Sequence, residues 1–168
     1  MATILSEALK NSIAFQGRAI RAAGNSIETK FMTARSFFDT NILIYADDRN
    51  APEKRDRALG LIAEHRRAGT GVVSLQVLQE YFVTATKKLR VDPRIVRRKV
   101  ELLAEFDVAG TDLSDILAAA DLHLLHGFSF WDALVMRSAK QSGCTVLLTE
   151  DMQETREIDG VLIVNPFR

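Results

Sequence analysis

The stretch SFFDTNILIY, residues 36–45, contains an apolar run that stops at an acid, Asp39, and apolar periodicity resumes behind that acid. A short aromatic or β-branched run predicts a buried strand, and the residues behind it predict a helix. The same arrangement recurs near the other end of the chain, where residues 145–149 lead to Asp151. Ligands bind beyond the carboxyl ends of the strands in an open parallel sheet. We therefore expect Asp39 and Asp151 to lie close together in space.

Each of these two acids has a simpler interpretation when it is taken alone. Asp39 could cap the following helix, with its side chain accepting a backbone N–H, and Asp151 could begin a turn. Two carboxylates that converge from distant parts of the chain nevertheless suggest a metal site, so the surrounding motifs must decide between the interpretations.

The composition is that of one globular domain with a substantial core. The 168 residues are 47% apolar and 26% charged, and 22 acidic residues balance 22 basic ones. Because the net charge is zero, binding of RNA or DNA must come from local patches. Cys144 is the single cysteine, which excludes an internal disulfide and fits a reducing compartment. No apolar run approaches the roughly 18 residues that cross a membrane, so we expect a cytoplasmic protein without membrane association.

The first 33 residues differ in pattern from the rest. Residues 1–33 are predicted to form an N-terminal extension with one candidate helix at about 6–23, and residues 34–168 are predicted to form the folded domain. Met32 stands just before the first core strand, so we interpret it as the native start. The segment before it is then a mis-assigned start or a partly disordered extension.

From residue 37 onward, short apolar strands alternate with amphipathic helices. Five strands separated by helices predict an α/β fold in which a mostly parallel sheet is covered on both faces. One predicted helix begins at a Ser74 cap and buries the stripe Leu75, Leu78, Phe82 and Ala85. The other strands are predicted at 71–73, 106–109, 146–148 and 161–164, and the other helices at 40–48, 53–67, 114–126 and 129–142. One more helix is predicted to follow Asp92-Pro93 and to carry Val96, Val100 and Leu103.

Two further acids stand inside helices and are ambiguous from pattern alone. Asp132 follows Ser129 by three positions, which is the spacing of a helix-capping arrangement. Glu80 projects away from the apolar stripe of its helix and shares a face with Gln76 and Lys87, which is typical of a solvated side chain. Pattern alone therefore favours a structural role for Asp132 and a solvated surface position for Glu80.

Taken together, four stretches resemble the PIN domain, the nuclease family that includes the VapC toxins of toxin–antitoxin pairs. They are residues 37–41 (FFDTN), 73–80 (VSLQVLQE), 130–134 (FWDAL) and 148–152 (LTEDM). Each stretch is weak alone, but their order and separation are specific, and the resemblance covers about residues 34–167. It implies a three-layer fold with a five-stranded, mostly parallel sheet. It also implies a catalytic set of four acids, Asp39, Glu80, Asp132 and Asp151, supported by Thr40, Asn41, Ser74 and Thr149.

A cluster of carboxylates without Cys or His suits a hard divalent cation, Mg²⁺ or Mn²⁺. We expect Asp39 and Asp151 to bind the metal directly, and Asp132 to bind it directly or through water. Glu80 would bind through water or orient the nucleophile. The expected reaction is metal-assisted hydrolysis of an RNA phosphodiester bond.

The densest basic stretch follows the helix that carries Glu80, and it can contact the phosphates of RNA or simply face solvent. The RNA-binding candidates are Lys87, Lys88, Arg90, Arg94, Arg97 and Arg98, with Lys99 beside them. Trp131 could stack on a base, although a core position is the simpler interpretation.

The resemblance implies a ribonuclease toxin that forms a homodimer and is silenced by a cognate VapB-like antitoxin, with operator DNA contacted only through the antitoxin. One alternative is a PIN nuclease that processes RNA without toxicity, and another is an inactive module that only binds a partner. A haloacid-dehalogenase-like phosphatase also places an acid after its first strand. Asn41 stands where that family has a second acid, which argues against it.

Overall fold

The computed structural model describes residues 34–153 and 156–168 of the protein. Within these ranges it contains one sheet of six strands in the order β3-β2-β1-β4-β6-β5. Neighbouring strands are parallel except β5 and β6, which are antiparallel. The predicted α/β class with a mostly parallel sheet is confirmed, with one strand more than the five predicted. The strands are β1 Ser36–Phe38, β2 Gly71–Ser74, β3 Asp107–Ala109, β4 Val146–Leu148, β5 Glu157–Ile158 and β6 Val161–Val164.

The additional strand, β5, forms a hairpin with β6. The two strands are joined by Asp159 and Gly160, whose φ angles are 53° and 83°. Positive φ at both central residues is the geometry of a type I′ turn, for which Asp-Gly is a favoured pair. The turn signal is present in the sequence, but a two-residue strand is too short to show alternation.

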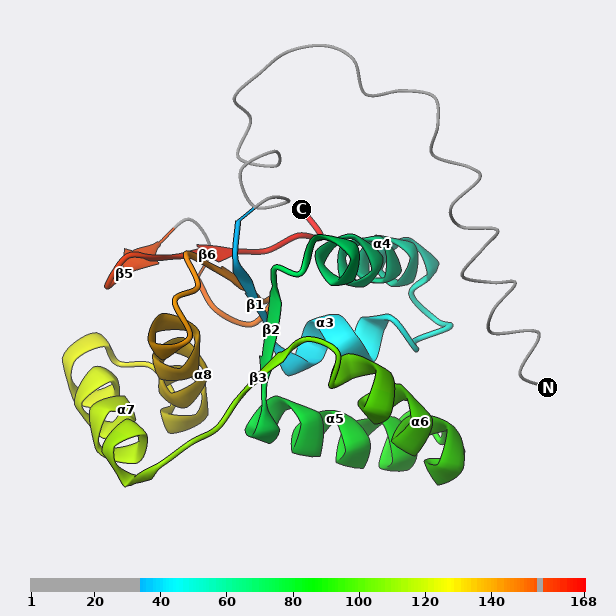
Figure 1. Ribbon diagram of the computed structural model, residues 1–168, viewed down its shortest axis with the longest axis horizontal. Helices are drawn as coiled ribbons and strands as arrows, with labels where there is room; N and C mark the ends of the chain where they lie inside the picture. The colour runs from blue at the N-terminus through cyan, green and yellow to red at the C-terminus, as the bar shows by residue number, and fades with distance from the viewer. Residues whose placement is uncertain (1–33, 154–155) are drawn as a thin grey trace, which may run out of the picture.

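Helices lie on both sides of the strands. In Figure 1, α7 and α8 lie to the left of β1, β2 and β3 and below β5 and β6, and α3, α4, α5 and α6 lie to the right of β1, β2 and β3. The predicted first helix ends early, at Tyr45 rather than Asp48, because the amides of Asp47 and Asp48 bond the carbonyls three residues back. The helices are α3 Thr40–Tyr45, α4 Pro52–Ala68, α5 Leu75–Lys87, α6 Pro93–Leu103, α7 Leu113–His126 and α8 Phe130–Gln141.

Side-chain caps fix the start of several helices. Ser74 Oγ accepts from the backbone N–H of Val77 at 3.2 Å, and Ser129 Oγ accepts from the backbone N–H of Asp132 at 3.1 Å. Both predicted serine caps are confirmed. Each cap satisfies an N–H group that has no partner within its own helix.

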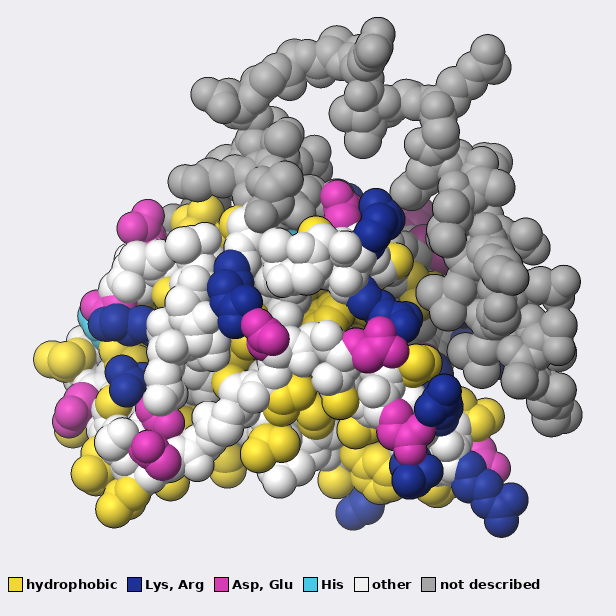
Figure 2. Space-filling model, viewed as in Figure 1, with side chains coloured by type: hydrophobic (Ala, Val, Ile, Leu, Met, Phe, Trp, Pro, Cys, Tyr) yellow, Lys and Arg dark blue, Asp and Glu magenta, His cyan; other side chains and the backbone are white. Residues whose placement is uncertain are grey.

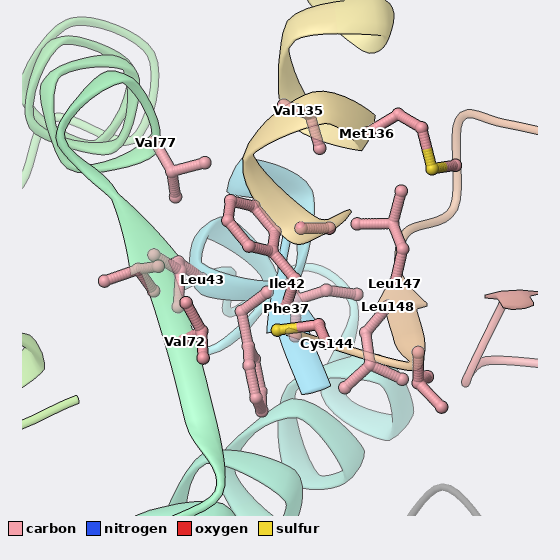
Figure 3. Close-up of a cluster of buried hydrophobic side chains, with 14 of the residues drawn as sticks. Phe37, Ile42, Leu43, Val72, Val77, Val135, Met136, Cys144, Leu147 and Leu148 are labelled. Atoms are coloured by element: carbon pink, nitrogen blue, oxygen red, sulfur yellow. The ribbon is translucent and has the colours of Figure 1, made fainter. Parts of the chain in front are cut away.

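The core fills the space between the sheet and the helices on its two sides. Figure 3 shows Phe37 and Leu147 from neighbouring strands, with Val135 and Met136 of α8 above them. Phe37 and Leu147 are fully buried. The parallel strands β1 and β4 are buried at every position because both of their faces are covered.

One close approach explains why the predicted third strand begins at Asp107 rather than Phe106. The ring of Phe106 packs against Phe38, with 5.2 Å between ring centroids, and lies over Gly71. A Cβ atom at position 71 would stand 2.6 Å from Phe106 Cε2. Phe106 is therefore a core residue that precedes the strand, and only glycine fits beneath it.

The buried face of α5 differs from the predicted stripe. Leu75 is 51% exposed and Phe82 is 38% exposed, so the prediction was wrong at these two positions. The buried residues of α5 are Val77, Leu78, Tyr81 and Ala85. Tyr81 replaces Phe82 on the inner face because its hydroxyl donates to Asp47 Oδ2 at 2.6 Å, which satisfies the polar tip of a buried aromatic side chain.

Two predictions concern the beginning of the chain. The candidate helix at about 6–23 and the start proposed at Met32 lie outside the described residues. No helix in the described ranges is long and apolar enough to cross a membrane.

Candidate active site

The sheet brings the two ends of the chain together at the carboxyl ends of β1 and β4. These strands are parallel neighbours with Phe38 opposite Leu148, and the backbone N–H of Asp39 donates to Leu148 O at 3.0 Å. Asp39 therefore follows β1 at the same edge of the sheet at which Asp151 follows β4.

Asn41 connects these two acids. Its Nδ2 atom lies 2.9 Å from Asp39 Oδ2 and 3.1 Å from Asp151 Oδ2. The same atom lies 3.1 Å from Thr149 Oγ1, and Asn41 Oδ1 accepts from the backbone N–H of Glu150 at 3.3 Å. A single amide in the first turn of α3 thus holds both carboxylates and the loop that carries the second one.

Asp39 has the most strongly perturbed environment in the site. Its side chain accepts from the backbone N–H of Thr40 at 2.6 Å and from Thr149 Oγ1 at 2.7 Å. Burial raises the pKa of Asp39 to about 6, against the lowering effect of those two hydrogen bonds, and the nearby charges of Asp151 and Glu80 raise it further. Burial and like charges both disfavour the ionised form. A cation at this position would relieve both penalties.

Glu80 reaches the same region from α5. Thr40 Oγ1 donates to Glu80 Oε2 at 2.8 Å, and Gln76 Nε2 donates to Glu80 Oε1 at 2.9 Å. Glu80 also lines a surface hollow together with Gln79, Val83 and Thr84. Its carboxylate is therefore oriented by its neighbours, which differs from the solvated side chain that helical periodicity favoured.

Asp132 lies in the first turn of α8. Its backbone N–H completes the Ser129 cap at the start of α8. Across residues 34–153 and 156–168, no three acidic, His or Cys side chains are close enough together to hold one ion. Asp39 is linked to Asp151 through Asn41 and to Glu80 through Thr40, by hydrogen bonds and not by direct contact of three carboxylates.

The four supporting residues divide into two groups. Thr40, Asn41 and Thr149 each hydrogen-bond an acid of the site. Ser74 is fully buried, and its hydroxyl caps α5. Its contribution is therefore to fix the helix on which Glu80 stands.

The basic stretch is only partly available to a ligand. Lys99 pairs with Asp47, and Arg97 and Arg98 both pair with Glu101. The other four candidates are exposed and form no ion pair within the described residues. These are Lys87, Lys88, Arg90 and Arg94. Trp131 is 60% exposed, so its predicted core position was wrong.

Sequence reasoning missed three side chains near the acids. The sequence placed Gln76 on the same helix face as Glu80, one turn earlier, but did not predict that Gln76 would donate a hydrogen bond to Glu80. Lys54 and Glu150 form an ion pair across two distant parts of the chain, and no local pattern indicates such a contact.

The donor set fits a hard divalent cation. The side chains that converge at the strand edge offer carboxylate, amide and hydroxyl oxygens, without a thiolate or an imidazole. Mg²⁺ is commonly bound by one or two carboxylates and retains several waters. The pair formed by Asp39 and Asp151 meets that requirement.

A comparison with protein-family models matches residues 36–160 to the PIN domain. The chain belongs to the PIN domain family. The resemblance carried by the four sequence stretches is thereby confirmed. Among curated proteins, no match is found.

Solved structures share the PIN fold of this chain. A toxin–antitoxin complex from Klebsiella pneumoniae aligns with a TM-score of 0.58 and 22% identity, over 78% of this chain and 97% of the other. VapC20 from Mycobacterium tuberculosis, a toxin that cleaves the sarcin–ricin loop, aligns with a TM-score of 0.58 and 17% identity. That alignment covers 69% of this chain and 89% of VapC20. At these identities the likeness establishes the fold.

Proposed function

We propose that this PIN domain is a metal-dependent endoribonuclease and the toxin of a VapBC-like toxin–antitoxin pair. The observation that carries the proposal is the carboxylate of Asp39, which is buried at the strand edge beside the charges of Asp151 and Glu80. Such crowding costs stability unless a cation is present, so it is expected at a functional site. The shared fold with a toxin–antitoxin complex and with an RNA-cleaving toxin supports the same function.

Asp39 and Asp151 would hold the cation directly, and Glu80 and Asp132 would act on it directly or through water. When bound, Mg²⁺ or Mn²⁺ supplies positive charge that stabilises the negative charge developing on the phosphate. Asn41 sets the distance between the two direct ligands because one amide group contacts both carboxylates.

The oriented carboxylate of Glu80 is suited to position the water that attacks the phosphorus. Thr40 and Gln76 each donate to one of its oxygens, which fixes the plane of the carboxylate. A carboxylate held in this way can accept a proton from water within hydrogen-bond distance. Cleavage would then transfer the water oxygen to phosphorus and release the leaving oxygen of the RNA backbone.

Four cations on α5, α6 and the loop between them would hold the RNA backbone. Figure 2 shows Lys and Arg side chains gathered at the lower right, over the ends of α5 and α6. Lys87, Lys88, Arg90 and Arg94 have no ion pair within the described residues, whereas Arg97 and Arg98 share Glu101. Contacts between phosphates and the first four would make affinity depend on salt concentration.

The partners follow from the same proposal. We expect a homodimer in the cytoplasm and a VapB-like antitoxin that places a basic side chain among the acids, where a charge-assisted hydrogen bond would compete with the metal. Contact with operator DNA would belong to the antitoxin.

Induced expression tests the toxin function. Wild type is compared with Asp39→Asn and Asp151→Asn, and with Asp121→Asn as a control at an exposed acid on α7, while new RNA 5′ ends are sequenced. We expect growth arrest and discrete cuts with wild type and the control, and neither with the two site variants. If soluble wild-type protein, expressed without antitoxin, leaves growth normal and RNA uncut, the proposal that the protein is a toxin is wrong.

That result would leave two alternatives. Cleavage of a defined RNA by the purified protein would then indicate a processing nuclease without toxicity. Absence of any cleavage in the presence of Mg²⁺ or Mn²⁺ would indicate a module that only binds a partner.

A further inference from the structure

The loop that delivers Asp151 has a second anchor besides Asn41. Glu150, the residue between Thr149 and Asp151, forms an ion pair with Lys54 of α4. Lys54 Nζ also donates to the hydroxyl of Tyr45, at the end of α3, at 3.1 Å. The pair therefore connects the loop after β4 to two helices on one side of the sheet.

Lys54 is held in place by aromatic rings. Its Nζ atom lies 4.4 Å from the centroid of the Tyr45 ring and 5.5 Å from that of Phe167. The two rings pack edge to face, with 4.9 Å between their centroids. A cation within about 6 Å of an aromatic centroid is attracted to the ring face. The ammonium group of Lys54 is thus contacted by a carboxylate, a hydroxyl group and two aromatic rings.

Asp151 needs such external support. The residue is exposed, and its carboxylate is held within the described residues by the Asn41 amide, at 3.1 Å. Asn41 Nδ2 has two hydrogens but lies near three acceptors, so this hydrogen bond has competition. Glu150, by contrast, is anchored at both its backbone and its side chain, by Asn41 and Lys54 respectively.

A second ion pair on the molecule provides a comparison. Lys140 and Asp159 pair at 2.6 Å, both with 44% exposed side chains, near the end of α8 and the turn before β6. Exposed pairs of this kind contribute little to folding stability. The side chains of Lys54 and Glu150 are less exposed, at 34% and 25%, and their pair is adjacent to an acid of the site.

We propose that Lys54 and Glu150 are positioning residues that hold Asp151 in the orientation needed to bind the divalent cation. The inference rests on the proposed metal-dependent function. Residues that orient a ligand through a hydrogen bond or ion pair commonly change metal affinity by about ten-fold or more when they are replaced.

Calorimetric titration of the full chain with Mg²⁺ tests this inference. The variant Lys54→Met/Glu150→Gln removes the pair without changing net charge, and Lys140→Met/Asp159→Asn is the matched control. We expect about ten-fold weaker binding in the first variant, wild-type affinity in the control, and similar melting temperatures in both. Lys54→Arg, which retains the charge, is expected to recover most of the affinity. Equal affinity in the two double variants would overturn the inference.

Hydrogen exchange of the metal-free protein gives a readout that does not depend on metal or activity. The backbone amides of Glu150 and Asp151 are expected to exchange faster in the Lys54→Met/Glu150→Gln variant than in the control. Unchanged exchange at both amides would also overturn the inference. If wild type binds no Mg²⁺ and cleaves no RNA, the proposed function fails instead, and this exchange experiment still tests whether the pair holds the loop.

Discussion

The carboxyl group of Asp39 makes metal binding sensitive to mildly acidic pH. Burial, opposed by hydrogen bonds from Thr149 and Thr40, raises its pKa to about 6, above the ordinary value of 3.8. In the metal-free protein, folding therefore favours the protonated carboxyl group of Asp39. The stabilising contribution of this protonated group to the free energy of unfolding is fully present below about pH 4. It is lost as the pH rises through about 6.

The cation requires ionised Asp39, so its effect has the opposite dependence on pH. We expect the rise in melting temperature caused by Mg²⁺ to be large at pH 7.5 and to diminish below about pH 6, with affinity falling up to ten-fold per pH unit. Thermal melts at several pH values, with and without Mg²⁺, measure this dependence. An equal stabilisation at pH 5 and pH 7.5 would show that Asp39 does not bind the metal.

His65 should weaken the fold in acid. Its ring is fully buried, Nδ1 lies 2.8 Å from Thr70 Oγ1, and Nε2 has no hydrogen-bond partner within the described part of the chain. Burial lowers the pKa of His65 from 6.5 to about 4. Neutral His65 therefore contributes to the free energy of unfolding above pH 6.5, and this contribution is lost as the pH falls through about 4. The lowering of its pKa corresponds to about 3 kcal/mol of unfolding free energy.

Denaturant titration of His65→Phe between pH 4 and pH 7 measures this effect. The His65 ring packs edge to face against Phe38, with 5.2 Å between ring centroids. A phenyl ring keeps this contact and does not titrate, so we expect a flatter dependence of unfolding free energy on pH than in wild type. Between about pH 4 and pH 6 the contributions of His65 and Asp39 have opposite signs, so the variant also reveals the Asp39 contribution. Identical pH dependence in wild type and variant would contradict the assignment.

At the scale of single elements, the start of α5 should contribute to stability rather than to metal binding. Ser74 is buried and its hydroxyl accepts from the backbone N–H of Val77. Ser74→Ala is expected to lower the free energy of unfolding by about 1 kcal/mol and to leave Mg²⁺ affinity near the wild-type value. Denaturant titration and calorimetry measure the two quantities. A loss of Mg²⁺ binding without a loss of stability would instead place Ser74 in the site.

An ion pair with a buried carboxylate joins α7 and α8. Arg137 Nε donates to Asp115 Oδ1 at 3.0 Å, and the Asp115 side chain is 2% exposed. Arg137→Met leaves this carboxylate without its cation, so we expect a loss of about 3 kcal/mol in unfolding free energy. The double variant Arg137→Met/Asp115→Asn should lose less, because no buried charge remains. Equal losses in the two variants would contradict this explanation.

The helices and strands that the sequence predicted are those with strong periodicity or clear caps. Ser74 and Ser129 marked helix starts correctly because capping is a local interaction. The inner face of α5 was assigned wrongly because Tyr81 and Phe82 are both aromatic, and their distinction depends on Asp47 of another segment. Local pattern cannot supply a contact of that kind.

At the scale of the whole molecule, the order of strands assembles the site. Placing β1 between β2 and β4 brings Asp39 beside the loop of Asp151, and β2 leads directly into the helix that carries Glu80. The sequence indicated that Asp39 and Asp151 would meet, since both follow buried strands. It did not indicate the ion pair of Lys54 with Glu150, because that contact depends on how distant segments pack.

The central claim is that Asp39 and its neighbouring acids form a metal-dependent nuclease site, and cleavage of RNA by the purified full chain tests it most directly. Wild type, Asp39→Asn and the control Asp121→Asn are incubated with total RNA, with Mg²⁺ or with a chelator. We expect discrete cleavage by wild type and the control only with Mg²⁺, and a loss of at least a hundred-fold, about 3 kcal/mol, in Asp39→Asn. Cleavage by Asp39→Asn at the wild-type rate, or cleavage that persists with chelator, would contradict the claim.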